Sequence, residues 1–268
     1  MSRRIVTFLL LALAVSLVKK ARADDSKTLD RQLNKTYKGK TLTLRKFYCG
    51  QVLHFNAEGG VLAGNLPGPW TVCGKVKVKH IKQRDQTLEI EGERTLVFYG
   101  GKGVQERSLD GGPVDIEVQL SANPASVEAT QPHLAKIFLA TNENLVDFVP
   151  DYWRPYLAKE RALPVDNPLP GRGTGTPPSF VKPPVVIHKP QPQYSEVARN
   201  ARLQGRVVLW IVVDAQGNVG KLQIVKPLGL GLDEDAVEVT QTWKFKPATR
   251  NGVPTAVRVM VETEFRLH

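Results

Sequence analysis

The stretch TWKFKPATRNGVPT, residues 242–255, decides the fold of the C-terminal part of this chain. It places Trp243 and Phe245 on either side of a lysine, then Pro247, then an Asn-Gly pair ending at Gly252. Proline cannot continue a helix, and Asn-Gly is typical of tight turns. The pattern therefore predicts that the two aromatic rings pack a preceding helix against a sheet and that the chain then turns into a last strand. All four residues are predicted to be structural rather than catalytic.

The residues before this stretch predict a helix followed by a β-hairpin. Residues 194–203 have helical spacing of apolar side chains, and Gly205 is placed to end the helix at its C′ position. Two apolar strands, Val207–Val213 and Val219–Val225, flank the sequence DAQGN at 214–218. A short loop of this composition between two apolar strands is typical of an antiparallel hairpin.

A second helix and a final strand are predicted on either side of the opening stretch. The first turn of the helix contains the acidic residues Asp233, Glu234 and Asp235, and the helix dipole favours negative charge there. Its apolar stripe consists of Leu232, Ala236, Val239 and Trp243. The final strand, Ala256–Leu267, alternates between two kinds of side chain. Its apolar face holds Val257, Val259, Val261 and Phe265, and its charged face holds Arg258, Glu262, Glu264 and Arg266.

These elements together resemble the C-terminal domain of the TonB energy-transducer family. The resemblance covers residues from about 182 to 268 and is carried by PQYSEVARNARLQGRVVLWIVVDAQGNV and GLDEDAVEVTQTWKFKPATRNGVPTAVRV. They contain P-x-Y before the first helix, D-x-x-G-x-V in the hairpin, and W-x-F-x-P after the second helix. The resemblance implies two helices packed on a three-stranded antiparallel sheet. It also implies binding of outer-membrane receptor or transporter segments and support of transmembrane transport across the cell envelope.

The resemblance further implies where such a partner binds. A receptor segment adds as a strand to the open edge of the last strand, and the region before the first helix makes further contacts. The pre-helix contacts fall on Gln191, Pro192, Gln193 and Tyr194. The edge strand is residues 255–264, with contacts at Thr255, Val257, Arg258, Val259, Met260 and Glu262. The alternative is that this edge is merely exposed and protected by its charges.

The N-terminus, MSRRIVTFLLLALAVSLVKKARADD, predicts export to the periplasm. Residues 1–23 have a basic start, an apolar run over 5–18 and an Ala-Arg-Ala cleavage pattern, as in a signal peptide. A helix of that apolar length falls short of the ~30 Å hydrocarbon core. Lys19 and Lys20 are unusual before a cleavage site, so an uncleaved inner-membrane anchor stays open.

Residues 5–18 contain no histidine, whereas the resemblance implies a histidine that couples the membrane helix to a proton-driven motor. Two functions are therefore carried forward. The first is a TonB-like periplasmic protein supporting transport, with outer-membrane segments and inner-membrane motor proteins as partners. The second is a soluble periplasmic adaptor or scaffold without proton-motive coupling. A homodimer is also left open.

Residues 24–158 predict a separate, mostly antiparallel β domain with a helical tail. A helix is expected over 24–38, and short strands follow over 41–48, 52–56, 70–79, 87–91, 95–99 and 114–120. In Lys75-Val76-Lys77-Val78-Lys79 the valines are predicted to face the core and the lysines water. Pro132–Ala140 is predicted as a helix with Pro132 in its first turn, and Asn142 as the N-cap of another.

Residues 159–181 are predicted to be a Pro/Gly-rich linker to the domain at 182–268. The proline-rich composition continues from Pro164 to Pro192, which predicts extended chain where the prolines cluster. In an oxidising compartment, Cys49 and Cys73 would most simply form one disulfide, since they are the only cysteines. Two buried thiols in neighbouring strands are the alternative.

Composition argues against nucleic-acid binding and against enzyme function. Removing residues 1–23 lowers Lys+Arg from 37 to 32 against 26 acids, so the formal charge falls from +11 to +6. No dense basic run with interleaved aromatic residues remains. The sequence lacks G-x-S-x-G, H-E-x-x-H and C-x-x-C, and its five histidines are scattered. We therefore expect no catalytic site, no cofactor and no metal.

Overall fold

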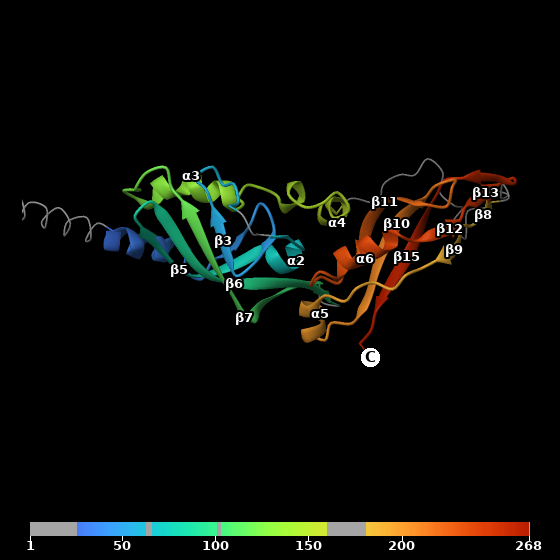
Figure 1. Cartoon of the computed structure of the whole chain (residues 1–268), viewed down its shortest axis with the longest axis horizontal. Helices are drawn as coiled ribbons and strands as arrows, with labels where there is room; N and C mark the ends of the chain where they lie inside the picture. Colours follow the sequence, from blue (N-terminus) through green and yellow to red (C-terminus); the bar gives the residue numbers. More distant parts are fainter. Residues whose placement is uncertain (1–25, 63–65, 101–102, 160–180, 268) are drawn as a thin grey trace, which may run out of the picture. The chain divides into compact units, whose positions relative to one another are not determined.

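The computed structural model describes residues 26–62, 66–100, 103–159 and 181–267 (Figure 1). The predicted export signal over 1–23 and most of the predicted linker lie outside these residues. None of the helices in the described ranges is both long and apolar enough to cross a membrane. The predicted α+β class is confirmed, with antiparallel sheets and few helices.

The chain divides into two units. The N-terminal unit comprises the residues up to Pro67 together with Gly74–Thr95 and Ser108–Thr141. The C-terminal unit comprises Gly68–Cys73, Leu96–Arg107 and the residues from Asn142 onward. The C-terminal unit thus includes a short helix and the adjoining ends of two strands, which are distant in sequence from its main part.

The N-terminal unit is built on a five-stranded sheet with the order β1-β5-β6-β7-β3. Its strands are β1 (Thr41–Thr43), β3 (Val52–Phe55), β5 (Lys75–Arg84), β6 (Thr87–Gly100) and β7 (Gly103–Gln119). β3 runs parallel to β7, whereas β5 is antiparallel to β1 and to β6. A two-stranded sheet joins β2 (Tyr48–Cys49) to β4 (Leu66–Pro67).

One face of this sheet is covered by two helices, over residues 26–37 and α3 (Val127–Ile137) (Figure 1). Leu29 and Leu33 from the first helix and Leu134 from α3 join one buried apolar cluster with the strands. Val76 and Val78 are fully buried in it while their lysine neighbours are not, which confirms the predicted alternation of β5. Burial of this apolar surface is the main force that closes the unit.

Three strand predictions in this region are wrong. The expected strand over 41–48 is interrupted and forms β1 and the start of β2. Residues 70–79 do not form one strand, because the N–H groups of Val72 and Cys73 donate to the Pro69 carbonyl and begin the short helix α2 (Trp70–Cys73). The expected strands over 87–91 and 95–99 are one continuous strand, β6. Gly92 lies inside β6 without interrupting it. A larger residue would not fit there, because a Cβ would lie only 2.6 Å from Val76 Cγ1. Close packing of β5 and β6 explains the glycine.

The predicted helices between 127 and 158 are shifted along the chain. α3 begins after Ser126, whose hydroxyl accepts from the Ala129 N–H, so Pro132 lies inside the helix and not in its first turn. Asn144, not Asn142, caps the next element, the single-turn 3₁₀ helix η1 (Leu145–Asp147). The Asn144 side chain accepts from the Val146 N–H at 3.1 Å. α4 (Arg154–Leu157) then follows.

The predicted disulfide is present: both Cys49 and Cys73 are disulfide-bonded, and the chain has no other cysteine. The buried Arg94 holds the residues on either side of Cys49. Its guanidinium donates to the carbonyls of Tyr48 and Gly50, at 2.9 and 3.0 Å. Burial lowers the pKa of Arg94 to about 10.

The main sheet of the C-terminal unit has three antiparallel strands in the order β11-β10-β15. They are β10 (Gly205–Val213), β11 (Val219–Lys226) and β15 (Val257–Phe265). Two helices accompany the sheet, α5 (Glu196–Asn200) and α6 (Leu232–Gln241). This is the arrangement that the family resemblance implies.

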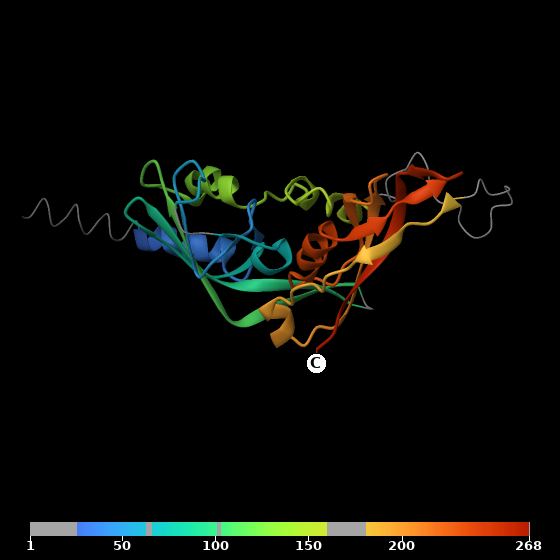
Figure 2. The same cartoon turned by 45° about the vertical axis from the view of Figure 1, so that its right-hand side comes forward.

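Two smaller sheets lie at one end of this unit (Figures 1 and 2). β9 (Val185–His188) pairs with β12 (Lys244–Lys246), and β13 (Ala248–Arg250) pairs with both β14 (Val253–Thr255) and β8 (Val181–Lys182). The proline-rich stretch is therefore not extended linker up to Pro192. Two of its segments add to sheets, because Val181 and Val185–His188 offer β-forming side chains between the prolines.

Residues 242–255 have the packing role that the sequence predicts. Trp243 is 1% exposed and Phe245 4% exposed, with ring centroids 6.3 Å apart. Asn251 and Gly252 both have positive φ and form the tight turn. This turn leads from β13 into β14, one strand earlier than predicted, and β15 follows. Gly217 is also required, because a Cβ there would lie 1.8 Å from the Phe245 carbonyl oxygen.

The end of α5 differs from the prediction. Gly205 does not occupy the C′ position but is the first residue of β10. Arg202 takes the left-handed conformation instead, with φ 51°, and the Leu203 N–H bonds back to the Ala198 carbonyl. This bond from C″ to C3 is the pattern of a Schellman ending.

Candidate partner-binding edge of the C-terminal sheet

β15 is an outer strand of the three-stranded sheet. It pairs with β10 from Gly205↔Phe265 to Val213↔Val257, and no other described strand pairs with its far side. The Glu262 carbonyl accepts from Lys189 Nζ at 3.4 Å, so we infer that it is directed away from β10. In an antiparallel strand the N–H and C=O of one residue point to the same side, and this side alternates along the strand. The backbone of Met260, two residues earlier, therefore also faces the open edge.

The six predicted strand contacts do not lie alike. Val257 is buried and Val259 is half-buried on the core side, so these two could contact a partner mainly through their backbone. Met260 and Glu262 are exposed on the opposite face, and Arg258 is half-buried there. Thr255 belongs to β14 rather than to the edge strand.

The outward face of β15 carries an aromatic–cation pair. Met260 lies opposite Trp210 of β10, and the Arg258 guanidinium stacks 4.3 Å from the Trp210 ring centroid. Burial against the ring lowers the pKa of Arg258, which nevertheless stays charged at neutral pH. Met260 is 51% exposed beside them. The strand therefore offers an apolar and cationic surface next to its open backbone.

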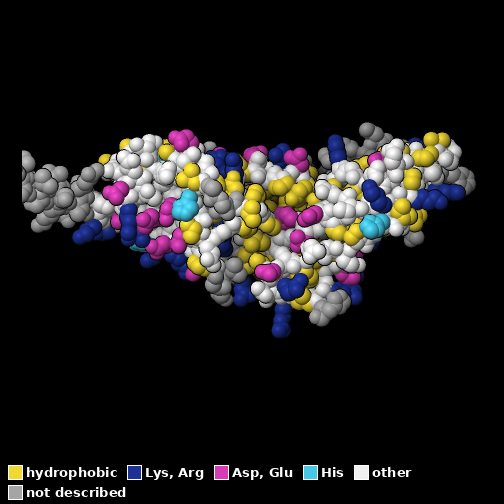
Figure 3. Space-filling model, in the orientation of Figure 1, with side chains coloured by type: hydrophobic (Ala, Val, Ile, Leu, Met, Phe, Trp, Pro, Cys, Tyr) yellow, Lys and Arg dark blue, Asp and Glu magenta, His cyan; other side chains and the backbone are white. Residues whose placement is uncertain are grey.

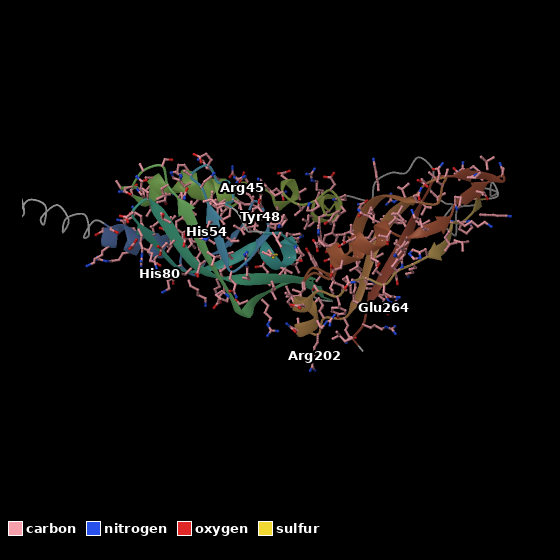
Figure 4. The ribbon with its side chains drawn as sticks, in the orientation of Figure 1. Arg45, Tyr48, His54, His80, Arg202 and Glu264 are labelled. Carbon is pink, nitrogen blue, oxygen red and sulfur yellow. The ribbon has the colours of Figure 1, made fainter. Side chains whose placement is uncertain are left out.

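The C-terminal end of β15 is charged on the same face. Glu264 pairs with Arg266 at 2.7 Å and with Arg206 at 3.5 Å, while Glu262 pairs with Arg206 at 3.0 Å. The hydrogen bond from Arg266 lowers the pKa of Glu264. Figure 4 shows Glu264 at this end of β15. Exposed pairs of this kind add little stability, but they separate the apolar part of the edge from its polar end.

The predicted pre-helix contacts lie against the same strand. The Tyr194 ring packs edge-on against Phe265 at 5.6 Å, and its hydroxyl donates to the Leu203 carbonyl. Gln191 and Gln193 are exposed, whereas Pro192 is half-buried. The structure thus brings the two predicted contact regions together, with Tyr194 as the anchor and the two glutamines facing solvent.

The opposite outer strand, β11, has a covered edge. The Ile224 N–H donates to the Tyr152 carbonyl at 2.9 Å. Beyond the end of β11, the Tyr99 N–H donates to the Leu228 carbonyl and the Leu230 N–H donates to the Val97 carbonyl. The two covering segments, one around Tyr152 and one over residues 97–99, both belong to the C-terminal unit. The outer side of β11 is therefore already paired with the chain itself at Ile224, and so is the chain just beyond the strand.

Trp153 holds the covering segments together. It is fully buried and contacts the rings of Trp70, Tyr99 and Tyr156, with centroids 5.4, 6.0 and 6.1 Å away. Its indole N–H donates to Glu234 Oε1 at 2.8 Å. Since Glu234 belongs to α6, this hydrogen bond ties the segment around 153 to the second helix of the domain.

The acidic start of α6 has a role that the sequence did not reveal. Asp233 is fully buried and accepts from the N–H groups of Leu228 and Gly229, at 2.8 and 2.7 Å. Burial raises the pKa of Asp233 and of Glu234. Repulsion from Asp235 adds to the shift of Asp233, and repulsion from Asp233 and Asp235 adds to the shift of Glu234. Burial also raises the pKa of Asp235 to about 6. Exposed carboxylates would be enough to interact with the helix dipole. The buried Asp233 therefore has a further role, which is to bind the backbone before the helix.

The N-terminal unit carries an acidic groove on the sheet face away from its helices. The groove has a volume of about 570 Å³ and is lined by residues that include Glu91, Glu93, Asp115, Glu117 and Lys79. Glu93 pairs with Lys79 at 2.9 Å, and Glu117 contacts His54 at 3.0 Å. No group of three or more His, Cys, Asp or Glu side chains in the described ranges is arranged to hold a metal ion. Figure 4 shows His54 and His80 on different strands.

Comparison with known proteins shows what the C-terminal domain is similar to. Residues 190–267 match the family described as Gram-negative bacterial TonB protein C-terminal. Protein TonB of Vibrio cholerae is 34% identical over 109 residues, which cover 38% of this chain and 45% of that protein. Protein TonB of Xanthomonas campestris pv. campestris is 38% identical over 78 residues, or 29% of this chain and 35% of that protein. The recognition of TonB family features from sequence is thus confirmed for this domain.

These similarities have limited extent. The chain spans less than half the length of either relative. A solution NMR structure of the Pseudomonas aeruginosa TonB C-terminal domain aligns with 34% of this chain and 92% of its own length, at 18% identity and a TM-score of 0.26. An overlap that weak carries no argument about the site.

Proposed function

We propose that this chain, whose C-terminal part is a TonB-family domain, works in the periplasm as a TonB-like protein of outer-membrane transport. In this proposal an extended segment of an outer-membrane receptor or transporter adds as a strand to β15. Gln191, Gln193 and Tyr194 contact the added segment from the pre-helix region. The chain acts by binding and not by catalysis.

The observation that carries the proposal is the difference between the two edges of one sheet. No strand in the described ranges pairs with the outer side of β15, whereas the N–H of Ile224 on β11 already donates to the Tyr152 carbonyl. An unpaired strand edge is completed by an extended peptide through main-chain hydrogen bonds, and neighbouring side chains then give specificity. Met260, Arg258 and Trp210 are placed to supply that specificity.

Site-specific photo-crosslinking in cells tests this proposal. A photo-reactive residue is placed at Met260 in the full chain, and the matched control carries it at Lys221, which is exposed on β11. We expect an adduct from position 260 that maps by mass spectrometry to one extended segment of an outer-membrane protein. The synthetic segment should then protect alternate amides of β15 from hydrogen exchange. Equal adducts from both positions, or none from position 260, would contradict strand addition.

A second measurement separates an anchored transducer from a soluble adaptor. The intact mass of the chain is determined in the periplasmic and inner-membrane fractions of cells. A product that retains residues 5–18 in the membrane fraction supports coupling to an inner-membrane motor. A product that begins at Asp24 in the soluble fraction supports the adaptor without proton-motive coupling.

A further inference from the structure

The end of the C-terminal unit that is formed by β8, β9 and β12–β14 carries positively charged side chains and no acidic ones. The two segments that build it, residues 181–189 and 244–256, contain no aspartate or glutamate. Their cationic residues are Lys182, Lys189, Lys244, Lys246 and Arg250. This end is therefore a concentrated positive surface within a unit whose acidic residues lie elsewhere.

Within the part of the chain that the structure describes, the lysines of this surface are not paired with carboxylates. Lys244 Nζ donates to Asn218 Oδ1 at 2.9 Å, and Lys189 lies over the Trp243 ring at 4.6 Å from its centroid. Lys182 and Lys246 are exposed, and neither has an ion-pair partner among the described residues. Unpaired lysines keep their charge available for an anionic partner.

Large apolar side chains are exposed among these lysines. Val185, Ile187 and Val253 are 56, 69 and 65% exposed. In the β9–β12 pair, Val185 lies opposite Lys246, and His188 lies opposite Lys244. Directly opposite residues share one face of a sheet, so apolar and cationic groups alternate there, while Phe245 between the lysines is buried. Figure 3 shows yellow and dark blue side chains together at this end of the unit.

We propose that this surface docks on a membrane that contains anionic phospholipid. Lysines attract anionic headgroups, and apolar side chains beside them enter the boundary between headgroups and acyl chains. An acidic protein would neutralise the lysines but leave Ile187 and Val253 exposed to its polar groups. A membrane interface accommodates both, because lysine side chains extend their amines to the headgroups while their neighbours are buried. The proposal does not depend on strand addition, since none of these residues belongs to β15.

Vesicle binding of the full chain tests the proposal. Purified protein is sedimented with vesicles of phosphatidylcholine alone or of phosphatidylcholine mixed with phosphatidylglycerol, at low and high salt. We expect binding only to the mixed vesicles and weaker binding at high salt, because salt screens exposed charges. A variant with Lys182→Gln, Lys244→Gln and Lys246→Gln should lose about a hundredfold in partitioning, at about fivefold for each lysine. Ile187→Ser should weaken binding as well.

A matched variant controls for net charge. It carries Arg202→Gln, Lys221→Gln and Lys226→Gln, three exposed cations elsewhere in the same unit. Circular dichroism of each variant verifies its fold, and crosslinking from Met260 separates a failure of this proposal from a failure of strand addition. Equal losses in both triple variants, equal binding to both kinds of vesicle, or no binding would overturn membrane docking. Binding of polyglutamate in place of vesicles would overturn it in favour of an acidic protein partner.

Discussion

The two outer strands of the C-terminal sheet, β11 and β15, border the same central strand and yet differ in what their outer sides meet. The β11 edge bonds to Tyr152, and the chain just beyond it bonds to residues 97 and 99. On the β15 edge, the Glu262 carbonyl accepts from the Lys189 side chain, and no strand in the described ranges pairs there. The backbone chemistry of the two edges is the same, so the difference arises from which segments pack beside them. This teaches that an open edge is a property of the whole unit and not of a strand sequence.

The largest expected effect comes from breaking the cover of β11. Trp153→Ala removes a fully buried ring and its hydrogen bond to Glu234. We expect a loss of about 3–5 kcal/mol in the free energy of unfolding, as for other buried aromatic truncations. The Ile224 amide should also exchange faster, since its acceptor belongs to the neighbouring residue Tyr152. Urea unfolding and hydrogen exchange measure the two effects.

The exposed Val253 provides the comparison for that variant. Val253→Ala should change stability by no more than about 0.5 kcal/mol, as is usual at surface positions. If Trp153→Ala behaved like Val253→Ala, the cover of β11 would not be a stabilising contact.

The buried acids of α6 make the same contact sensitive to pH. Burial raises the folded-state pKa of Glu234 above its usual value, so the folded state binds more protons than the unfolded state above about pH 4. Stability should therefore fall as the pH rises from about 5 to about 8, by up to about 1.4 kcal/mol per pH unit for one such group. Glu234→Gln retains an acceptor for Trp153 and should flatten this dependence, as measured by urea unfolding across the pH range.

The control for the pH dependence is Glu196→Gln, which removes an exposed acid from α5. Its slope of stability against pH should match that of the unchanged protein. A Glu234→Gln protein with an unaltered slope would show that Asp233 and Asp235 account for the dependence, and not Glu234.

On the β15 side, a proline sharpens the comparison. Met260→Pro removes one backbone N–H that we infer to face the open edge. Proline is tolerated at such a position of an edge strand, because no bond within the sheet is lost. We expect an about tenfold loss of affinity for the crosslinked receptor segment, from one hydrogen bond and a steric block. The thermal midpoint should change little. Calorimetric titration and a melting curve measure the two, with Met260→Leu as the matched variant. Equal affinity of the two variants would argue that the segment does not pair with this edge.

The smallest expected effect concerns the anchor before α5. Tyr194→Phe keeps the ring against Phe265 but removes the hydroxyl that donates to the Leu203 carbonyl. A loss of about 1 kcal/mol in stability is expected, with a smaller loss in segment binding. Ser195→Ala tests the neighbouring helix cap, because its hydroxyl accepts from the Ala198 N–H. Binding that failed completely in Tyr194→Phe would give this hydroxyl a direct role in recognition.

Much of the C-terminal domain could be predicted because its signals are local. The hairpin at 214–218, the packing of Trp243 and Phe245 and the Asn251-Gly252 turn each depend on residues close together in sequence. The predicted contacts at Tyr194 and on β15 were also brought together. Whether they bind a partner stays a prediction.

Local propensity does not account for three of the observed features. α2 looked like the start of a strand because Trp70 and Val72 favour strands, but Trp70 is held against Trp153. Asp233 looked like an ordinary acid of a first helical turn, and only its burial shows that it binds two backbone N–H groups. Arg202, rather than a glycine, ends α5, which no local propensity favours.

The sequence by itself determined the main helices and strands of the C-terminal domain, the alternation of β5 and the resemblance of that domain to the TonB family, because these depend on side-chain period, turn residues and short motifs. Tertiary structure alone decided which edge of the sheet is open and which acids are buried. It also decided that segments of a proline-rich stretch become strands beside Lys244 and Lys246. These outcomes depend on which segments meet, and hydrogen bonding and desolvation act on groups only after the fold has brought them together.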